Sequence, residues 1–477
     1  MTELVNHPFI NAVLPHLIAI GGFLLALFLI ARLMSEKRQP SNTVAWLLVI
    51  VLVPYVGVPL YLLLGGRKLR TLMARKGRLQ AKLLVKERLP SPHENFPIAQ
   101  TVMASGAEAP VVGNTIRLLT TGEDAYAALE ENIRAAKQCI HIIAFILGRD
   151  DTGRRIVRLL AAKAKEGVKV RLLLDTVGCM FLSRDFLAPL KQAGGEVGWF
   201  MPVLPFTLRG TANLRNHRKI AVFDYHTAIV GGHNMAREYI GPAPYRKRWR
   251  DFGAVIDGPA ATVLHEVFVA DWCFATKETP ERLHAEMPAE ATAPRGTSEL
   301  QVVASGPDVR GDPLYEGILA MIQEAEKSVW IVTPYFIPDE VLLRSLIVKA
   351  RTGRDVTLIL PARSNHPITD FARRYYVREL QRAGGRVRLF GPGMMHSKAM
   401  IVDDQIGLFG SPNFDLRSLF VNFEIGVLVH TASDVQAMKA WATELFDKCH
   451  PPKGERARRS FVGSVLEDLS RLLAPLL

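Results

Sequence analysis

The sequence predicts an α/β protein in which two tandem domains, each a mixed β-sheet flanked by helices, follow a transmembrane helical hairpin. Three observations support this fold class. Apolar runs typical of buried strands alternate with helical segments. The order of these segments occurs twice in the chain, which at 477 residues exceeds what one hydrophobic core usually supports. Two long stretches near the N-terminus carry no charged side chain.

Composition indicates an anionic partner and no metal framework. The chain has 59 Lys and Arg against 46 Asp and Glu, a formal net charge of +13 and a pI near 9.6. This balance favours either a nucleic acid or an anionic membrane. The 4 cysteines form no C-x-x-C pair, so we expect buried reduced thiols and neither a disulfide framework nor a zinc site.

Residues 1–66 are predicted to form the membrane hairpin. Residues 9–31 are apolar and uncharged, and they meet the length of about 20 residues that a spanning helix requires. Residues 43–66 are also uncharged, but Pro54 and Pro59 interrupt them, so this segment either spans the bilayer or re-enters it. No Lys or Arg precedes the first stretch, which disfavours a cleaved signal peptide.

Residues 67–113 are predicted to be a basic segment followed by a linker. Residues 66–90 contain nine Lys and Arg, whereas the turn between the hydrophobic stretches contains three. The positive-inside rule then places the large C-terminal part in the cytoplasm. The leucines of the basic segment follow one helical face, which fits either an amphipathic helix on anionic headgroups or a solvated linker.

The repeat sets the remaining boundaries. We expect a first domain over residues 114–280, a linker over 281–298, and a second domain over 299–477 that ends in an amphipathic helix. Buried strands are expected in both domains, within residues 139–147, 168–175, 329–336 and 355–361. Residues 203–216 form an insertion in the first domain only, either a packed loop or a lip that dips into the bilayer.

A chemical motif occurs once in each domain. Residues 217–234 and 396–413 share the spacing H-x-K-x-x-x-x-D-x-x-x-x-x-x-G-[GS]-x-N. Strand alternation would place each histidine and its lysine on one face. Two histidines, two lysines and two asparagines would together surround a phosphodiester. Lysines beside each imidazole disfavour a metal, and no cofactor is expected.

The doubled motif resembles that of the phospholipase D superfamily, and the whole chain is similar to bacterial cardiolipin synthases. The similarity includes the N-terminal hairpin and the segments TPYFIPDE (333–340), SNHPITDFARRYYVREL (364–380), GSPNFDLRS (410–418) and NFEIG (422–426). It implies two phospholipase D-like domains in a multi-pass protein of the bacterial inner membrane. The catalytic domains are expected on the cytoplasmic side.

The resemblance also implies roles for the motif residues. One histidine attacks phosphorus and the other transfers protons, as an in-line displacement between two domains requires. We expect His217 to form a phosphatidyl-histidine from one phosphatidylglycerol, and His396 to protonate the glycerol and activate a second phosphatidylglycerol; the reverse assignment stays open. Charge on the non-bridging oxygens would be held by Lys219, Lys398, Asn234 and Asn413.

Acidic residues downstream of each motif complete the predicted site. The resemblance implies that Glu424 orients His217 and that Asp251 orients His396. The motif aspartates Asp224 and Asp403 are interpreted as structural supports, with a catalytic role as the lesser alternative. Further candidates for substrate binding are Ser411, Arg215, Tyr335 and Trp249.

Three classes of function fit these observations. The leading one is a phosphatidyltransferase that makes cardiolipin. The second is a phospholipase D-type hydrolase acting on phospholipid or, less favoured, on nucleic acid, and the third is a non-enzymatic membrane scaffold. We expect phosphatidylglycerol and cardiolipin as partners in a membrane-embedded protein, and no nucleic acid. The oligomeric state stays open, with a homodimer as one option.

Overall fold

The computed structural model describes residues 8–35, 40–64, 76, 90–201, 214–288, 293–309 and 311–452. These residues form an N-terminal unit, described over 8–64, and a larger unit, described from residue 76 onward. Three predictions fall outside the described residues. They are the amphipathic helix within 67–89 (except at Lys76), most of the insertion at 203–216, and the C-terminal helix over 459–477.

The N-terminal unit consists of helices α1 (Pro8–Ser35), α2 (Pro40–Leu52) and α3 (Pro54–Leu64). It has a small core of its own, formed by Leu29, Trp46, Ile50 and Tyr61. Within the described residues no helix combines the length and the apolar character that a bilayer crossing requires. The predicted transmembrane hairpin is therefore not confirmed, and its second segment is two helices of 13 and 11 residues that break at Pro54.

Most strands of the larger unit belong to one sheet with two similar halves. The first half contains β1 (Val111–Leu119), β2 (Cys139–Ala144), β3 (Lys169–Asp175), β4 (Glu196–Phe200), β5 (Ile220–Phe223), β6 (Thr227–Gly231) and β7 (Gly253–Asp257). The second half contains β8 (Ser298–Ser305), β9 (Ser328–Val332), β11 (Asp355–Pro361), β12 (Arg386–Phe390), β13 (Ala399–Val402), β14 (Ile406–Gly410), β16 (Glu424–Val429) and β17 (Cys449–His450). A separate two-stranded ribbon pairs β10 (Phe336–Ile337) with β15 (Phe414–Asp415).

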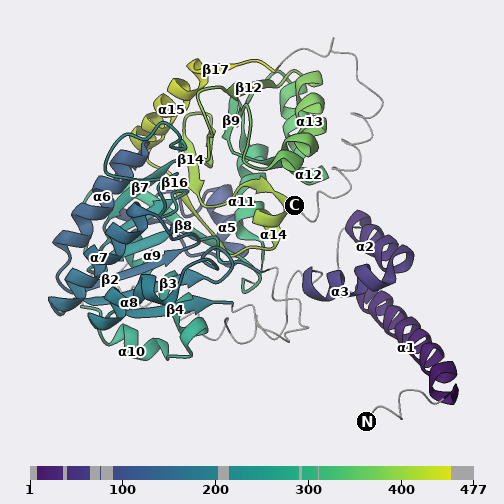
Figure 1. Cartoon of the computed structure of the whole chain (residues 1–477). Helices are drawn as coiled ribbons and strands as arrows, with labels where there is room; N and C mark the ends of the chain where they lie inside the picture. The colour runs from purple at the N-terminus through teal and green to yellow at the C-terminus, as the bar shows by residue number, and fades with distance from the viewer. Residues whose placement is uncertain are drawn as a thin grey trace. The chain divides into compact units, whose positions relative to one another are not determined.

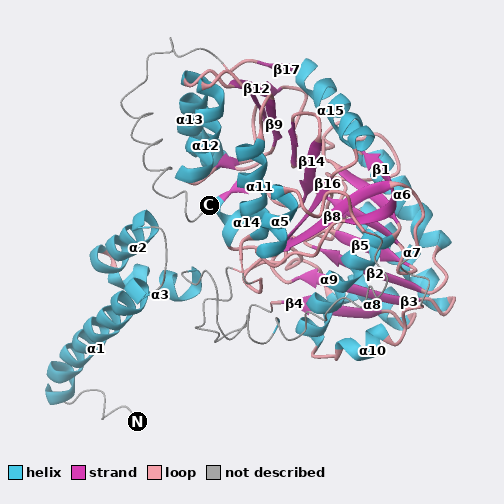
Figure 2. Cartoon of the chain, turned by 180° about the vertical axis from the view of Figure 1, so that it is seen from behind, coloured by secondary structure: helices cyan, strands magenta, loops and turns pink. Residues whose placement is uncertain are grey.

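The strand order of the large sheet has approximate twofold symmetry. Its 15 strands run β17-β12-β11-β9-β13-β14-β16-β8-β1-β7-β6-β5-β2-β3-β4. The first strands of the two halves, β1 and β8, pair antiparallel at the centre. Within each half three strands pair in parallel, such as β2 with β3 and β3 with β4, and the others pair antiparallel. The predicted mixed α/β architecture is confirmed, and Figure 2 shows its strands running through the middle of the larger unit.

Helices cover both faces of this sheet. The first half contributes α6 (Gly122–Ala135), α7 (Asp151–Lys165), α8 (Arg184–Gln192), α9 (Pro259–Thr276) and α10 (Pro280–His284). The second half contributes α11 (Pro313–Glu324), α12 (Glu340–Arg351), α13 (Pro367–Arg382), α14 (Leu416–Phe420) and α15 (Ala432–Asp447). In Figure 1, α12 and α13 lie together beside β12.

One core joins the two halves of the larger unit. Phe252, the residue before β7, packs with a ring-centroid distance of 4.1 Å against Trp441 of α15 and 5.5 Å against Phe409 of β14. Both partners belong to the other half. These residues are members of a single buried cluster that also includes apolar residues along α9, from Ala260 to Cys273. The halves are therefore packed as one body.

Two local predictions were wrong. Helix α5 (Pro97–Ala104) lies where a linker was expected; Ala99 and Val102 are fully buried and the helix packs on α11. The H-x-K triplets were expected on strands, but β5 begins at Ile220 and β13 at Ala399, so each triplet precedes its strand. Instead of joining the strands, the segments just before them pair with the backbone of the other half.

Candidate active site

Two short backbone bridges bring the histidine motifs together. Asn216 bridges in parallel with Phe423, and Arg250 with Met395. The His217 amide donates to the Phe423 carbonyl at 2.9 Å, and the His396 amide donates to the Arg250 carbonyl at 2.6 Å. Each histidine therefore lies beside the residue that precedes the acid of the other half. This register places Glu424 next to His217 and Asp251 next to His396.

The first pair joins His217 to Glu424. The imidazole Nδ1 lies 2.9 Å and 3.0 Å from the two carboxylate oxygens. Glu424 also accepts hydrogen bonds from the Ser411 hydroxyl and, at 3.3 Å, from the Asn422 amide. Since Nδ1 is held by the carboxylate, Nε2 is the nitrogen left for chemistry. Phe145 meets the imidazole edge-on, with a centroid distance of 4.9 Å.

The second pair joins His396 to Asp251. Its Nδ1 lies 2.6 Å from Asp251 Oδ2, while Oδ1 accepts from the Phe252 amide at 2.8 Å. The rings of Tyr239 and Trp249 lie 5.1 Å and 5.5 Å from the imidazole. Both histidines are thus buried against aromatic side chains, and each is oriented by a carboxylate from the opposite half.

The acids are packed differently in the two halves. Ser411, which holds Glu424, corresponds in the motif to Gly232. A Cβ placed on Gly232 would lie 2.1 Å from Asp251 Oδ1, so that position has no room for a side chain. The shorter aspartate therefore packs against bare backbone, whereas the longer glutamate is fixed by a hydroxyl. Ser411 contacts the orienting acid of the site.

Both motif lysines are buried beside the imidazoles. Lys219 Nζ donates to the His217 carbonyl at 2.6 Å, and Lys398 Nζ lies 2.7 Å from Nδ1 and 3.0 Å from Nε2 of His396. Burial lowers the pKa of Lys219 to about 7 and that of Lys398 to about 8, although the nearby carboxylates oppose the effect. Both lysines therefore have pKa values near neutral pH. An anion bound between the two ammonium groups would favour their charged forms.

Burial also favours neutral imidazoles in this site. It lowers the pKa of His217 to about 4, with Glu424 opposing and Lys219 adding to the shift. The pKa of His396 is lowered well below its usual value by burial, followed by the charges of Lys398 and Lys219. A neutral imidazole has a free lone pair, which a nucleophile needs.

The motif asparagines are buried next to this centre. Asn234 Oδ1 accepts from the Ile146 amide at 3.3 Å. Asn413 Nδ2 donates to the Ser418 hydroxyl at 3.2 Å, and its Oδ1 has no hydrogen-bond partner among the described residues. Each of the two side chains is therefore held by a hydrogen bond within the protein.

The motif aspartates lie away from the site. Asp224 accepts from the backbone amides of residues 137–139 at 2.7–3.1 Å. Asp403 accepts from those of residues 326–328 at 2.7–2.8 Å. Both follow a strand in a turn with positive φ, at 48° and 55°. Each aspartate therefore ties its own turn to the start of the neighbouring strand, β2 or β9, which agrees with the structural interpretation.

Two predicted substrate-binding residues have protein partners. Arg215 is buried, with Nη1 3.7 Å from Asp175 Oδ1 and 3.3 Å from the Met201 carbonyl. The Tyr335 hydroxyl donates to Asn365 Oδ1 at 2.5 Å. Burial chiefly raises the pKa of Tyr335, and the charges of Asp415, Asp370 and Asp251 add to the shift.

Sequence reasoning missed several neighbours of the site. Phe145 and Tyr239 carry no spacing signal, because nothing in a linear pattern relates them to a histidine. Asp271 could have been found from the sequence, because it is a charged residue in an apolar stretch of α9. A charged side chain that is buried requires a partner. Asp271 binds the side chains of Asn216 and Arg218, on either side of His217.

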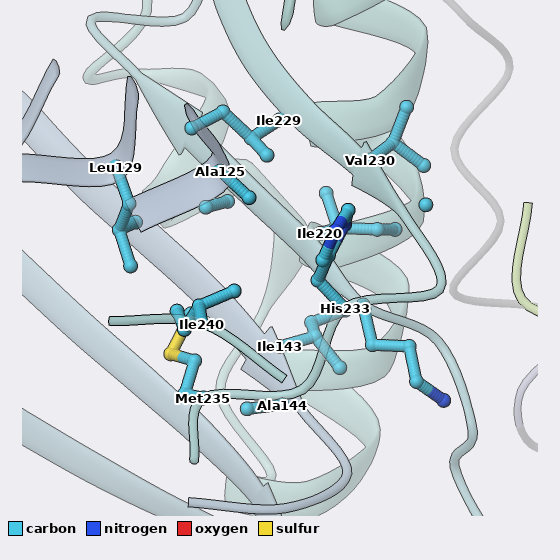
Figure 3. Close-up of a pocket in the computed structure, with 13 residues that line it drawn as sticks. Ala125, Leu129, Ile143, Ala144, Ile220, Ile229, Val230, His233, Met235 and Ile240 are labelled. Atoms are coloured by element: carbon cyan, nitrogen blue, oxygen red, sulfur yellow. The ribbon is translucent and has the colours of Figure 1, made fainter. Parts of the chain in front are cut away.

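A small cavity lies behind the first motif. Lys219 and His233 reach it, and its other lining residues are mostly apolar (Figure 3). Its volume of about 40 Å³ is too small for a phospholipid headgroup. Among the described residues no group of three or more His, Cys, Asp and Glu side chains is placed to hold a metal ion.

Comparison with known proteins gives the same picture across nearly the whole chain. Residues 129–272 and 318–446 match the family "Cardiolipin synthase, PLD-like domain", and residues 23–66 match "Phospholipase_D-nuclease N-terminal". A phosphatidylserine synthase from Haemophilus influenzae Rd KW20 shares the fold, with a TM-score of 0.61 and 16% identity over 80% of this chain and 100% of that chain.

Two sequence relatives are similar over most of their length. The chain is 35% identical over 458 residues to a cardiolipin synthase from Geobacillus sp. (strain WCH70), and 36% identical over 458 residues to one from Halalkalibacterium halodurans. Each alignment covers 93% of this chain and 90% of the relative. The chain therefore belongs to the cardiolipin synthase family of phospholipase D-like proteins.

Proposed function

We propose that the chain makes cardiolipin by transferring a phosphatidyl group from one phosphatidylglycerol to another, with release of glycerol. One observation carries this proposal: two buried imidazoles, each held at Nδ1 by a carboxylate of the opposite half, lie with two buried lysines. A phosphodiester with one negative charge fits between such groups. The two imidazoles then serve the two sides of an in-line displacement.

In the first step, His217 Nε2 attacks phosphorus. A P–N bond forms, and the bond from phosphorus to the glycerol oxygen breaks. His396 gives its proton to the departing oxygen, so glycerol leaves neutral. His396 must carry that proton beforehand, although burial, followed by the charges of Lys398 and Lys219, lowers its pKa. The bound phosphodiester neutralises those charges and thereby raises the pKa of His396.

In the second step, His396 removes a proton from the terminal hydroxyl of a second phosphatidylglycerol. That oxygen attacks phosphorus, the P–N bond breaks, and His217 is regenerated with its lone pair. Lys219, Lys398, Asn234 and Asn413 hold the non-bridging oxygens in both steps. No net proton is consumed, because His396 donates one proton and takes one back.

The asymmetry of the two acids supports His217 as the nucleophile. The pKa of Glu424 is lowered despite its burial, chiefly by His217, so this acid stays ionised and holds the Nδ1 proton. Burial raises the pKa of Asp251. A carboxylate with a raised pKa accepts a proton from its histidine more readily. The Asp251–His396 pair is therefore the better suited of the two to proton transfer. The reverse assignment is tested below.

We further propose that the N-terminal unit attaches the protein to the bacterial inner membrane, with the phospholipase D-like domains (114–280 and 299–477) on the cytoplasmic side. Large apolar side chains of this unit are exposed, among them Phe23, Phe28 and Tyr55 at 65%, 62% and 86%. Side chains of this kind stabilise contact with lipid. The basic residues within 66–90 other than the buried Lys76 favour an anionic leaflet.

The test uses purified full-length protein and vesicles of phosphatidylglycerol. Cardiolipin and glycerol should form in equal amounts, and His217→Ala and His396→Ala should both abolish turnover. Phosphatidic acid as the sole lipid product would instead establish a hydrolase. Rapid quenching of the wild-type protein with lipid should leave a phosphatidyl adduct on His217, detectable by peptide mass spectrometry; an adduct on His396 would reverse the two roles.

A further inference from the structure

The two residues that flank His217 are held by one buried acid of α9. Asn216 Nδ2 donates to Asp271 Oδ2 at 2.8 Å, and Arg218 Nη1 donates to Asp271 Oδ1 at 2.7 Å. All three side chains are almost completely buried. Since His217 lies between the two donors, Asp271 fixes the backbone on both sides of this histidine.

Arg218 extends the same network to the partner of His217. Its Nε donates to the Glu424 carbonyl at 3.0 Å, and its Nη2 donates to the Ser305 carbonyl at 3.0 Å. The guanidinium therefore links the motif of the first half to the orienting acid of the second half. A shift of Arg218 would move His217 and Glu424 relative to each other.

Lys76 is the fourth charged member of this network. It is the only residue between positions 65 and 89 that the structure describes, and it lies outside all three segments that match family models. Its side chain is 0% exposed and binds Asp271, and Asp308 at 2.7 Å. Its ammonium also lies 4.5 Å from the ring centroid of Phe423, the residue that precedes Glu424. The sequence placed this lysine in a basic segment facing headgroups or solvent.

The network is balanced in charge only when Lys76 is present. Two cations, Lys76 and Arg218, face two anions, Asp271 and Asp308. Removing Lys76 leaves two buried carboxylates with one guanidinium, and an uncompensated buried charge is strongly unfavourable. A cavity of about 90 Å³ borders Lys76, Arg218 and Asp308, so there is space for these side chains to move. The groups that would move are the ones that hold His217 and Glu424.

We propose that Lys76 is a positioning residue for the His217–Glu424 pair, supplied by the segment between the N-terminal family match (23–66) and the first match to the PLD-like domain (129–272). It acts through Asp271 and Arg218 and does not touch the lipid. The inference rests on the proposed function only in that His217 takes part in the chemistry. It adds a residue outside the duplicated domains to the machinery of the site.

The first experiment compares three variants of the full-length protein on phosphatidylglycerol vesicles. Lys76→Met should lower kcat about 100-fold, because displacing a reacting group by about 1 Å has an effect of this size. KM should stay within about threefold, since Lys76 makes no substrate contact. Lys76→Arg should recover most of kcat because it keeps the charge. Lys82→Met removes one charge from the same basic segment and controls for a general loss of membrane attraction.

The second experiment restores the balance of charge without the lysine. Adding Asp308→Asn to Lys76→Met leaves one cation and one anion, Arg218 and Asp271, so kcat should rise at least about tenfold above that of Lys76→Met. If Lys76→Met alone unfolds, the double variant should still fold, because its buried charges are balanced, and kcat can then be measured on it. Thermal unfolding of each variant separates loss of fold from loss of rate.

The outcomes distinguish this inference from the proposed function. An inactive wild-type protein would refute cardiolipin synthesis. If the wild-type protein is active, the Lys76 inference is overturned by a kcat of Lys76→Met within twofold of wild type, by an equal loss in Lys82→Met, or by a folded double variant with no recovery of kcat. A change confined to KM would also overturn it, because that result would indicate a lipid contact.

Discussion

At the residue scale, the two orienting acids differ in reach and in packing. Glu424 is held by Ser411 and Asn422, whereas Asp251 lies against the backbone of Gly232. A shorter acid needs the backbone close, and a longer one needs a side chain to hold it. The two halves of the site therefore differ at one motif position, which is Gly232 in the first half and Ser411 in the second.

This packing makes Gly232→Ala a specific test of the His396–Asp251 pair. The new methyl group would lie 2.1 Å from the present position of Asp251 Oδ1, and Asp251 is fully buried, so the carboxylate must shift away from His396. We expect kcat to fall about 10- to 100-fold, measured with phosphatidylglycerol vesicles. Gly393→Ala is the matched control, because a Cβ there meets no atom within 4 Å. Equal rates for the two variants would contradict the asymmetry.

The lysines predict the alkaline limb of the pH profile. Burial lowers the pKa of Lys219 to about 7, so the free enzyme loses this ammonium as pH rises through about 7. The neutral amine attracts the phosphodiester less, and kcat/KM should therefore fall above that pH. In the lipid complex the bound anion raises the pKa, so the limb of kcat should lie at higher pH than that of kcat/KM.

Lys219→Arg checks the origin of this limb. Arginine keeps its charge throughout the accessible pH range, so the limb near pH 7 in kcat/KM should move upward to that set by Lys398, whose pKa is about 8. The absolute rate should fall, because a guanidinium does not reproduce the geometry of the ammonium. A limb that stays near pH 7 in Lys219→Arg would show that another group titrates there.

At the scale of elements, the motif aspartates connect strands. Asp403 accepts hydrogen bonds from three consecutive amides at the start of β9, and Asp224 does the same at β2. Asp404, next to Asp403, has a similar backbone with φ of 58° against 55°, but its carboxylate makes a single interaction among the described residues, an ion pair of 2.7 Å with Lys439. Adjacent aspartates thus share a backbone conformation and differ in what their carboxylates bind.

This pair separates hydrogen bonding from backbone strain. Asp403→Ala and Asp404→Ala carry the same cost of an alanine at positive φ. Asp403→Ala in addition leaves amides without their charged acceptor, so we expect it to lower the free energy of unfolding by about 1.5–3 kcal/mol more than Asp404→Ala. Urea unfolding measures the difference. The kcat of folded Asp403→Ala should stay near wild type, and a loss of kcat without a loss of stability would revive the catalytic alternative.

The sequence predicted the elements that local patterns encode. The apolar runs at 168–175 and 355–361 became β3 and β11, and the swapped acids Asp251 and Glu424 were inferred from family resemblance. Local patterns did not reveal contacts that depend on distant segments. Val102 is buried because α11 packs on it, and Lys76 is buried because Asp271 and Asp308 lie there. A charged residue in a basic stretch gives no local sign of such partners.

At the scale of the whole molecule, the two halves of the larger unit share one site. The sheet continues across β1 and β8, and each histidine is paired by backbone and side chain with the other half. Separating the halves would remove the orienting acid from both imidazoles at once. The duplication thus provides two similar sets of groups, and the backbone bridges convert them into one catalytic centre.

The N-terminal unit, by contrast, has a separate small core of Leu29, Trp46, Ile50 and Tyr61. A variant that lacks residues 1–66 keeps Lys76 and the whole of the larger unit. We expect its melting temperature to stay within about 2 °C of wild type, a shift that corresponds to roughly 1–2 kcal/mol in a unit of this length. With phosphatidylglycerol in detergent micelles, its kcat should also stay within about threefold, because every group of the site is retained.

On vesicles the same variant should lose activity. Attachment raises the local concentration of enzyme at the lipid surface, and its loss should lower turnover at limiting lipid at least about tenfold. Flotation with phosphatidylglycerol vesicles measures the attachment directly, and Lys76→Met with residues 1–66 present should float as wild type does. If the shortened protein turns over vesicles at the full rate, residues 1–66 do not attach the enzyme to its substrate. If it loses activity in micelles as well, the N-terminal unit contributes to the site itself.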